Sequence, residues 1–329
     1  MKKVINICFS TDDKFTELCT IAMLSIAIHT CKESFLQFFI IDNGILLSTK
    51  EKMLESLKKY NISIIFLNGV NVEEVLGRKI NSGKWPIDVL KRLFISKLVP
   101  HSVKRILYLD CDILVRHSLE NLYESNLENY YAAAVKDCIS DTVRRKIGLL
   151  KGVGYFNSGV ILINLEKWRK SNIEEQFLLF LKQHLDKLQY IDQDIFNGVL
   201  ADKVKVLRSK YNVMTAMFNY SREDLMFYHN CNDYHSNEEF NEAHNDPTIV
   251  HFSSDLLSIR PWYKNGSHIY RDEWLLIRKR SFWKDEPLWD DKEDKMQKIK
   301  RFLYKILPKS IGLKLARFIH MRHIKNIYD

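Results

Sequence analysis

Apolar runs and helical patterns alternate along the first hundred positions of the chain. Short apolar runs at residues 4–9, 35–41 and 62–67 predict strands. Residues 15–31 place apolar side chains at helical spacing, and Ser48 and Glu51 form a capping-box pattern for a helix that ends near residue 60. Strands and helices that repeat in this way predict an α/β fold, in which helices flank a mainly parallel sheet on both faces.

A fourth apolar strand ends in two carboxylates. Residues 105–115 read Arg-Ile-Leu-Tyr-Leu-Asp-Cys-Asp-Ile-Leu-Val, and their apolar part is too uniform for a strand with one solvated face. Asp110 and Asp112 point the same way in an extended segment, whereas Cys111 points elsewhere. A bare Asp-x-Asp is most often a surface turn, but after a buried strand the two acids can converge on one hard cation.

The second half of the chain continues the pattern with shorter segments. We expect a helix over 87–98, strands at 130–135 and 160–164, a loop around Asn157, and helices that start at 165 and at 190. Asp192, near the start of the last helix, suits a helix cap as well as a ligand contact. Residues 221–245 predict loops and short helices, and a last short strand at 248–252 contains His251. A lone histidine in such a strand is usually part of the core.

Length and cysteine usage limit the class of protein. A chain of 329 residues that is 46% hydrophobic suits one main domain, residues 1–283, with an extension over 284–329. The six cysteines include no Cys-x-x-Cys pair, which indicates free thiols in a reducing compartment. The first apolar run is too short for a signal peptide, and no run is long enough to span a membrane.

The net charge of +9 is concentrated at the C-terminal end. Residues 295–329 contain ten basic residues and one acidic residue, so the rest of the chain is neutral. An acid-rich run at 285–294 predicts a solvated linker before this basic tail. A neutral body without a nucleic-acid-binding motif argues against nucleic acid as a partner.

The basic tail also has an amphipathic pattern. Apolar residues recur at helical spacing at 299, 302, 303, 306 and 307, then at 311, 315, 318 and 319, and Pro308 separates the two sets. Two basic amphipathic helices are typical of an interfacial anchor on an anionic membrane, where each basic residue contributes about 1 kcal/mol. The alternatives are a helical extension packed on the main domain or a partner-binding arm.

Five blocks of sequence, in order, resemble glycosyltransferase family 8, the retaining enzymes with the Rossmann-like GT-A fold. They are Phe-Ser-Thr-Asp-Asp at 9–13, Tyr-Leu-Asp-Cys-Asp at 108–112, Tyr-Phe-Asn-Ser-Gly-Val-Ile-Leu-Ile-Asn-Leu-Glu-Lys-Trp at 155–168, Asp-Gln-Asp at 192–194, and His-Phe at 251–252 with Arg-Pro-Trp at 260–262. The likeness extends over most of the first 283 residues and is greatest to bacterial lipopolysaccharide galactosyl- and glucosyltransferases.

The resemblance implies a UDP-sugar donor and a divalent cation. Its ligands would be Asp110, Asp112 and His251, and the cation would be Mn²⁺, with Mg²⁺ as the alternative. Oxygen ligands with one imidazole suit manganese. Such a cation neutralises the departing diphosphate as a Lewis acid.

The resemblance also implies contacts to the nucleotide and to the donor sugar. The residues at these positions are Ser10, Asp12, Phe15, Arg92, Asp110, Cys111, Asn157, Ser158 and Arg260. Helix capping is the competing role for Asp12, and Asp13 is expected to do only that. Arg260 stands where the family has a lysine, in a segment after His251 that lacks the family's glycine and carries an insertion. A guanidinium can still hold a diphosphate.

By the same resemblance, Gln193, Asp192 and Asp137 lie closest to the chemistry. A double displacement needs a carboxylate nucleophile, but the group nearest the anomeric carbon in this family is the glutamine. We therefore favour attack on the same face as the leaving diphosphate, with electrostatic stabilisation as the main effect. Asp192 remains the alternative, as a nucleophile.

Three functions agree with these features. The first is transfer of galactose or glucose from the UDP-sugar to a glycan or glycolipid acceptor, such as lipopolysaccharide or another cell-surface glycan. This reaction would take place in the cytoplasm, at the inner face of the bacterial membrane. The second is a glycosyltransferase that acts on a protein such as an adhesin, and the third is an inactive sugar-nucleotide-binding partner subunit.

Overall fold

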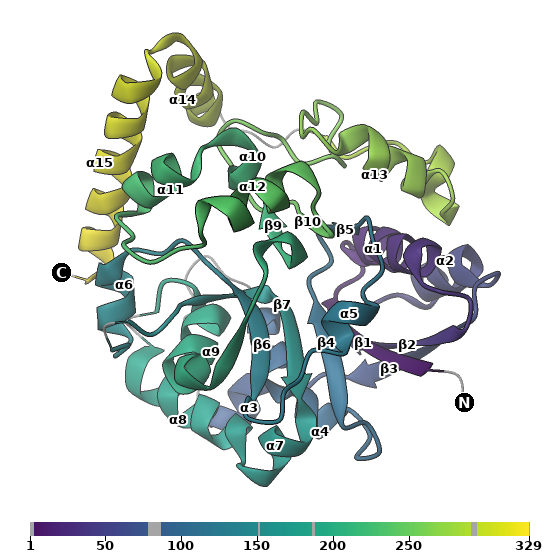
Figure 1. Ribbon diagram of the computed structural model, residues 1–329. Helices are drawn as coiled ribbons and strands as arrows, with labels where there is room; N and C mark the ends of the chain where they lie inside the picture. Colours follow the sequence, from purple (N-terminus) through teal and green to yellow (C-terminus); the bar gives the residue numbers. More distant parts are fainter. Residues whose placement is uncertain (1–2, 78–86, 151, 186–187, 291–294, 329) are drawn as a thin grey trace.

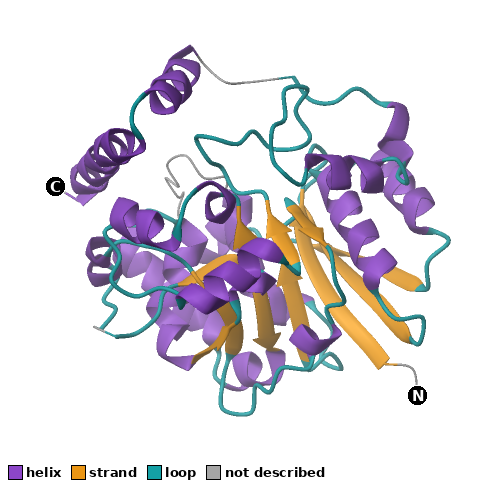
Figure 2. Ribbon diagram, turned by 45° about the horizontal axis from the view of Figure 1, so that its top comes forward, coloured by secondary structure: helices purple, strands orange, loops and turns teal. Residues whose placement is uncertain are grey.

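The computed structural model describes residues 3–77, 87–150, 152–185, 188–290 and 295–328 (Figure 1). Strands form a central layer with helices on both sides (Figure 2). The main sheet has seven strands in the order β3-β2-β1-β4-β7-β6-β8. These strands are β1 (Lys3–Thr11), β2 (Ser34–Asp42), β3 (Ile62–Asn68), β4 (Arg105–Leu109), β6 (Ala132–Lys136), β7 (Phe156–Asn164) and β8 (Val204–Leu207).

The main sheet is mixed and mostly parallel, which confirms the expected fold class. Strands β3, β2, β1 and β4 are parallel neighbours, β8 is parallel to β6, and β7 runs antiparallel to both β4 and β6. The apolar part of β4 is buried on both faces, as its uniform composition predicts. Its carboxyl end therefore lies in the middle of the sheet.

Two hydrophobic clusters cover the two faces of this sheet. Leu107 and Leu109 belong to one cluster, and Ile106 and Tyr108 belong to the other, as strand alternation requires. The first face is covered by α1 (Thr16–His29), α2 (Leu47–Leu57) and α13 (Arg271–Arg278). The second is covered by η1 (Ile87–Phe94), α4 (Ile95–Leu98), α7 (Leu165–Lys170), α8 (Ile173–His184) and α9 (Ile191–Leu200).

A second, three-stranded sheet crosses above the carboxyl end of β4. It contains β5 (Ile113–Val115), β10 (Ile249–His251) and β9 (Val213–Met214), in the order β5-β10-β9. Strand β5 begins directly after Asp112 and pairs antiparallel with β10, which places His251 opposite Ile113. This pairing brings two distant parts of the chain to one place.

Shorter elements complete the fold. They are α3 (Val72–Leu76), α5 (Glu120–Tyr123), α6 (Asp141–Lys146), η3 (Ala201–Lys203), η4 (Ser209–Tyr211), α10 (Ala216–Asn219), α11 (Arg222–His229), α12 (Asn237–Asn245) and η5 (Phe282–Asp285). Helices α11 and α12 lie in the polar region for which short helices were expected.

Two local expectations were wrong. The segment around Asn157 is not a loop, because β7 already begins at Phe156, which pairs with Lys136 across a bulge. Ser48 does not cap α2, since this helix begins at Leu47 and the Leu46 N–H donates instead to the Asp13 carboxylate at 2.9 Å. The helix expected over 87–98 is confirmed, as a 3₁₀ helix followed by a single α-helical turn.

The C-terminal tail forms the two expected helices, α14 (Lys295–Ile306) and α15 (Lys309–Tyr328). Helix α15 packs along α11 at one edge of the molecule (Figure 1). Lys309 forms an ion pair with Asp224, and Ile324 is buried in a cluster with Ile139 and Val143. The tail therefore packs on the main domain through α15, and this packing does not decide between an extension and a membrane anchor, because other apolar side chains of the tail are exposed. None of the described helices is long and apolar enough to cross a membrane.

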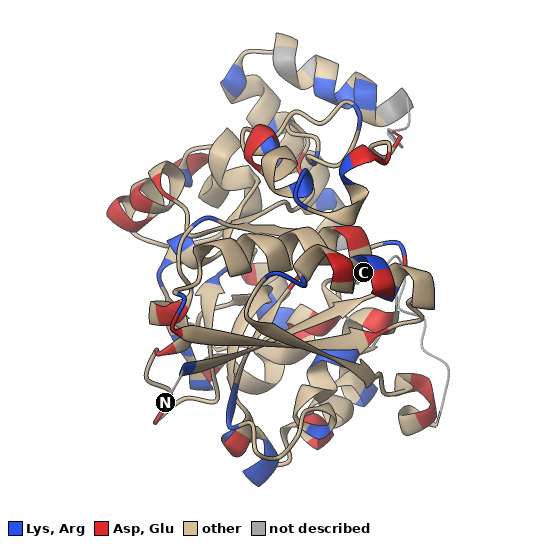
Figure 3. Cartoon of the chain, turned by 90° about the vertical axis from the view of Figure 1, so that its right-hand side faces the viewer, with Lys and Arg blue, Asp and Glu red and all other residues tan. Residues whose placement is uncertain are grey.

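The beginning of the expected linker is not solvated along its whole length. Trp289 exchanges backbone hydrogen bonds with Trp262 and Lys264, both at 2.9 Å, and packs edge-on against Phe15. The last acidic residues of this run, at 291–294, lie outside the described residues. Basic and acidic residues are interspersed over the body of the molecule (Figure 3), in agreement with its neutral charge.

Candidate functional site

Two aspartates and one histidine converge at the carboxyl end of β4. The Nε2 atom of His251 lies 3.2 Å from an oxygen of Asp112 and 3.9 Å from an oxygen of Asp110. One potential ligand atom from each residue lies within 4.8 Å of the other two. Two carboxylates and an imidazole in this arrangement fit a divalent cation such as Mn²⁺.

Asn212 orients the imidazole of His251, and its role was not foreseen. The Asn212 side-chain oxygen lies 2.9 Å from Nδ1 of His251, while its amide nitrogen donates to the Asn157 side-chain oxygen at 2.8 Å. The oxygen of Asn212 can only accept, so Nδ1 of His251 must carry the hydrogen. When neutral, His251 would therefore offer the lone pair of Nε2 to a cation held between it and the two aspartates.

Gly159 allows these groups to approach the backbone of β7. A Cβ atom at this position would lie 2.5 Å from Cε1 of His251 and 2.9 Å from an oxygen of Asp110. The carbonyl of Gly159 also accepts the Asp110 N–H at 2.8 Å. A glycine in a buried strand with a residue packed directly over it marks such a close approach.

Arg92 provides a buried positive charge beside the aspartates. One of its terminal nitrogens lies 2.8 Å from Asp110 and 3.3 Å from Asp192, and its guanidinium stacks on the Tyr108 ring. Burial is the largest single influence and opposes the charge of Arg92, but Asp110, Tyr108 and Asp192 together outweigh it and raise the pKa of the guanidinium. Its Nε atom is buried and has no hydrogen-bond partner among the described residues.

The surroundings of the two aspartates shift their pKa values in opposite directions. Burial is the largest influence on both and favours the protonated form. It raises the pKa of Asp110, against the effect of Arg92. For Asp112, the charge and hydrogen bond of His251, together with Arg260, overcome burial and lower the pKa to about 2. The same partnership with Asp112 raises the pKa of His251 in spite of its burial.

Two adjoining cavities contain every residue proposed for the site. The Phe15 cavity, of about 290 Å³, is lined by Ser10, Asp12, Phe15 and Cys111 among others. The Gln193 cavity, of about 570 Å³, is lined by Asp137, Asn157, Ser158, Asp192, Gln193 and His251 among others. Arg92, Asp110, Asp112 and Arg260 line both cavities. The candidate metal-binding cluster of Asp110, Asp112 and His251 therefore lies where the two cavities meet.

Gln193 is held at both ends of its side-chain amide. Its nitrogen donates to Asp137 at 3.0 Å, and its oxygen accepts the Ser158 N–H at 3.1 Å. Asn157 donates to the same oxygen of Asp137 at 3.2 Å. Burial nevertheless raises the pKa of Asp137. These bonds fix the position of Gln193 in the wall of its cavity.

Asp192 lines the Gln193 cavity and does not cap its helix. Its carboxylate accepts the Ser158 hydroxyl at 2.9 Å and pairs with Arg92. The N-cap residue of α9 is Tyr190. The backbone N–H groups of Gln189 and Tyr190 donate to Asp194, at 2.7 and 2.8 Å.

The segment after His251 folds back so that Arg260 reaches the cluster. The Nε atom of Arg260 donates to the Phe252 carbonyl at 2.8 Å, and a terminal nitrogen donates to Asp112 at 3.4 Å. The guanidinium also lies over the Trp262 ring. The missing glycine thus does not prevent Arg260 from lining both cavities.

The loop after β1 forms the outer wall of the Phe15 cavity. The carboxylate of Asp12 accepts the Phe15 N–H at 2.8 Å in the turn before α1, whose N-cap residue is Phe15, so Asp12 stabilises this turn and does not cap the helix. Ser10 accepts a hydrogen bond from Asn43, and its carbonyl accepts one from Cys111. Cys111 therefore lines the Phe15 cavity and also donates to the backbone of β1.

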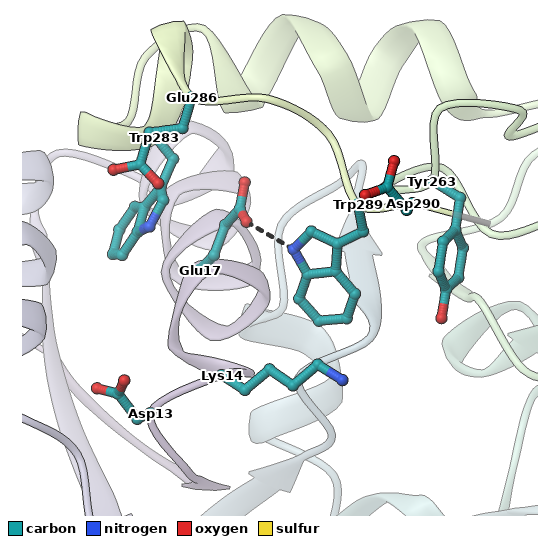
Figure 4. Close-up of a pocket in the computed structure, with 8 residues that line it drawn as sticks. All are labelled: Asp13, Lys14, Glu17, Tyr263, Trp283, Glu286, Trp289 and Asp290. Carbon is teal, nitrogen blue, oxygen red and sulfur yellow. Dashed lines mark hydrogen bonds between the residues drawn. The ribbon is translucent and has the colours of Figure 1, made fainter. Parts of the chain in front are cut away.

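Asp13 belongs to a different hollow. This Trp289 cavity, of about 360 Å³, lies between α1 and the C-terminal part of the body and is lined by Asp13, Lys14, Glu17, Tyr263, Trp283, Glu286, Trp289 and Asp290 (Figure 4). Glu17 accepts the Trp289 indole N–H at 3.2 Å and pairs with Arg278 at 2.7 Å. Asp13 thus acts on the start of α2 and not on the metal-binding cluster.

Comparisons with known proteins agree with this fold and site. The model of the family described as glycosyl transferase family 8 matches residues 6–266. General stress protein A of Bacillus subtilis (strain 168) is 28% identical over 286 residues, covering 85% of this chain and 95% of that protein. The lipopolysaccharide 1,2-glucosyltransferase of Escherichia coli is 26% identical over 311 residues, covering 92% and 87%.

A solved structure has the same fold. The galactosyltransferase LgtC, in complex with donor and acceptor sugar analogs, superimposes with a TM-score of 0.70 at 25% sequence identity. The match covers 84% of this chain and 96% of LgtC. The protein thus has the fold of the GT-A glycosyltransferases. With the family model matching most of its length, this chain belongs to glycosyl transferase family 8.

Proposed function

We propose that this protein is a retaining glycosyltransferase that moves galactose or glucose from a UDP-sugar to a glycan acceptor. The observation that carries this proposal is the position of Asp110, Asp112 and His251 at the junction of the Phe15 and Gln193 cavities. A diphosphate at this junction would join a nucleotide in one cavity to a sugar in the other.

Each cavity offers groups that suit its part of the donor. The Phe15 cavity combines an aromatic ring with the polar side chains of Ser10 and Asp12, which suits a nucleoside. The Gln193 cavity presents Asp137, Asn157 and other hydrogen-bonding side chains, which suit sugar hydroxyls. Arg92 and Arg260, which line both cavities, add positive charge for the diphosphate.

Asp110, Asp112 and His251 would hold Mn²⁺, or Mg²⁺ as the alternative. When bound there, the cation would supply Lewis-acid stabilisation of the diphosphate. Asn212 maintains the tautomer of His251 that can act as a ligand. Arg260 donates to Asp112 and lines both cavities, so its guanidinium would lie beside a diphosphate bound at the cluster.

The arrangement around Gln193 favours attack on the same face of the sugar. The acceptor oxygen would bond to the anomeric carbon as the bond to the diphosphate oxygen breaks, and the acceptor proton would pass to the diphosphate. Gln193 is an uncharged amide, and Asp192 is engaged by Arg92 and Ser158, so neither is a free nucleophile. A glycosyl adduct trapped on Asp192 would overturn this preference.

Metal-dependent release of UDP tests the proposal. UDP-galactose and UDP-glucose are each incubated with the full chain and Mn²⁺, Mg²⁺ or a chelator. We expect release from one or both donors with metal only, and release at background level from Asp110→Ala. The control, Asp202→Ala, changes an exposed aspartate away from the cavities and should retain wild-type activity. Absence of release from any UDP-sugar would favour the inactive partner subunit.

The acceptor we propose is a bacterial cell-surface glycan, lipopolysaccharide in the first instance. Support comes from the Escherichia coli relative, which is named for lipopolysaccharide glucosyl transfer and is matched over 87% of its length. A protein acceptor such as an adhesin is the competing possibility. Transfer of radiolabelled hexose into a lipid extract and not into protein would distinguish the two.

We also propose that the tail holds the enzyme at the inner face of the cytoplasmic membrane. Seven large apolar side chains of α14 and α15 are about half exposed or more; they are Ile299, Phe302, Ile306, Ile311, Leu315, Phe318 and Ile319. The same helices contain the chain's excess of basic residues. Exposed apolar and basic groups together suit an anionic lipid surface.

A further inference from the structure

A fourth cavity lies beside the Gln193 cavity, and the C-terminal helix α15 forms one of its walls. This Tyr228 cavity has a volume of about 300 Å³, and Ala316 and His320 of α15 form one side of it. Tyr220, Tyr228 and Asp255 contribute to the other sides. The tail, which lies outside the matched residues 6–266, therefore lines a cavity of the main body.

The Tyr228 cavity continues directly into the Gln193 cavity. Four residues line both, namely Tyr190, Ala216, His229 and Ser254. Tyr190 immediately precedes α9, the helix that carries Asp192 and Gln193. A molecule that extended out of the Gln193 cavity on this side would thus enter the Tyr228 cavity.

The lining of the Tyr228 cavity has the character of a carbohydrate site. Half-buried tyrosine rings at 190, 220 and 228 offer flat apolar surfaces with a polar end, which suit the C–H faces and hydroxyls of a pyranose. Asp255 is held by the Asn219 amide at 2.6 Å and by the Leu257 N–H at 2.7 Å, so its carboxylate is fixed in place.

His229 adds an unsatisfied hydrogen-bonding atom at the junction of the two cavities. Its Nδ1 atom is buried and has no hydrogen-bond partner among the described residues. Burial lowers the pKa of His229 to about 3, with the neighbouring His320 as a further cause, so the ring is neutral near pH 7. A neutral imidazole can either donate to or accept from a sugar hydroxyl.

The wall that α15 contributes is held rigidly. His320 stacks on Tyr228 with ring centres 4.7 Å apart, and Arg317 lies over the Phe227 ring. Arg317 also donates to Asn230 at 2.8 Å. Contacts along one side of α15 leave its opposite side, with Leu315 and Phe318, facing outward.

We propose that the Tyr228 cavity is a second glycan subsite, which binds the sugar units of the acceptor beyond the one that receives the hexose. This inference rests on the proposed glycosyl transfer, because the acceptor hydroxyl must lie in the Gln193 cavity. Helix α15 would then have two roles. One face would bind the acceptor glycan, and the other would face the membrane in which a lipid-linked acceptor is anchored.

Two variants and one control test this subsite. Ala316→Trp fills the cavity from α15, and Tyr228→Ala removes an aromatic wall without adding bulk. Leu315→Trp introduces the same side chain one residue away, at a position 47% exposed, and serves as the matched control. The probes are lipid-free hexose mono-, di- and trisaccharides on a glycan array, bound by the full chain with Mn²⁺ and UDP. UDP-sugar hydrolysis is measured in parallel.

We expect wild type and Leu315→Trp to bind di- or trisaccharides more tightly than monosaccharides. Ala316→Trp and Tyr228→Ala should lose that binding at least tenfold and hydrolyse the donor at the wild-type rate. Unchanged glycan binding by both variants overturns the subsite, as does a wild-type protein that hydrolyses the donor and binds no glycan. If Ala316→Trp also loses donor hydrolysis, the added bulk has disturbed the fold, and the glycan binding of Tyr228→Ala then tests the subsite. Absence of UDP-sugar hydrolysis in the wild type refutes the proposed glycosyl transfer. Glycan binding on the array still tests, separately, whether the Tyr228 cavity binds sugars.

Discussion

At the scale of single residues, the site depends on groups that do not themselves carry its chemistry. Gly159 leaves room for His251 and Asp110, and Asn212 determines which imidazole nitrogen faces the aspartates. The sequence motif pointed to Asp110 and Asp112 because two acids after an apolar strand are unusual. No local signal distinguishes Asn212 from any other polar residue beside a short strand.

Gly159→Ala should damage the metal site with little effect on the rest of the fold. The added methyl group would overlap His251 and Asp110, which would have to move apart. We expect Mn²⁺ affinity, measured by calorimetry, to fall at least tenfold, with UDP release reduced in parallel. Gly312→Ala is the control, because a Cβ atom there would only reach ordinary contact with Tyr304. Wild-type Mn²⁺ affinity in Gly159→Ala would contradict the close approach described for β7.

Asn212→Ala should weaken metal binding through the orientation of His251. Loss of a group that hydrogen-bonds the second nitrogen of a metal-ligating histidine typically costs about 10- to 100-fold in affinity or activity. We expect a loss in that range for Mn²⁺, with the KM for the UDP-sugar less affected at saturating metal. Equal Mn²⁺ affinity in the variant and the wild type would show that His251 needs no such support.

At the scale of secondary-structure elements, the apolar runs predicted the central strands well. Strands β1 to β4 extend at most two residues beyond the predicted runs, because uniform apolar segments are buried wherever the sheet is covered on both faces. Strand β7 was predicted to begin too late. Its first residues include Asn157, Ser158 and Gly159, which have low strand propensity, and pairing with β6 and close packing against the cluster override that preference.

His268 should make the packing between β10 and α13 sensitive to acid. It is buried against Phe252 and Phe218, and burial lowers its pKa to about 4. In the unfolded chain His268 takes up a proton near pH 6.5, whereas in the folded protein it does so only near pH 4. Protonation of the unfolded chain therefore lowers the free energy of unfolding as the pH falls from 6.5 to 4. In His268→Phe, the slope of unfolding free energy against pH in that window should decrease by up to about 1.4 kcal/mol per pH unit. Denaturant unfolding at several pH values measures it, and an unchanged slope would contradict this assignment.

At the scale of the whole molecule, the C-terminal helices face both the body and the solvent. Ile324 is 2% exposed and belongs to a buried cluster, whereas Phe302 and Phe318 are each 63% exposed. Removing the tail would delete its exposed apolar face and would also expose the buried cluster that contains Ile324. A truncation therefore cannot isolate the effect on membrane binding. Substitutions on the outer face can.

The double variant Phe302→Ser with Phe318→Ser should bind anionic liposomes at least tenfold more weakly than wild type. Both side chains are exposed, so the thermal stability should be nearly unchanged. Leu150→Ser, which removes an apolar side chain 76% exposed on the body, is the matched control. Co-sedimentation with anionic and with neutral vesicles measures the effect. Equal sedimentation of the double variant and wild type would refute the membrane role of this face.

Much of the candidate site could thus be predicted from sequence, because its residues lie at the ends of apolar runs or in blocks that resemble a family. The local order of residues determined where strands form, which acids follow them and where the basic charge lies, since burial and side-chain alternation act over a few neighbouring positions. Only the tertiary structure decided that β5 pairs with β10 and so brings His251 to Asp112. It likewise placed α15 on α11, where it walls the Tyr228 cavity. Contacts between such distant segments depend on how whole elements pack, and that information is absent from any short stretch of the chain.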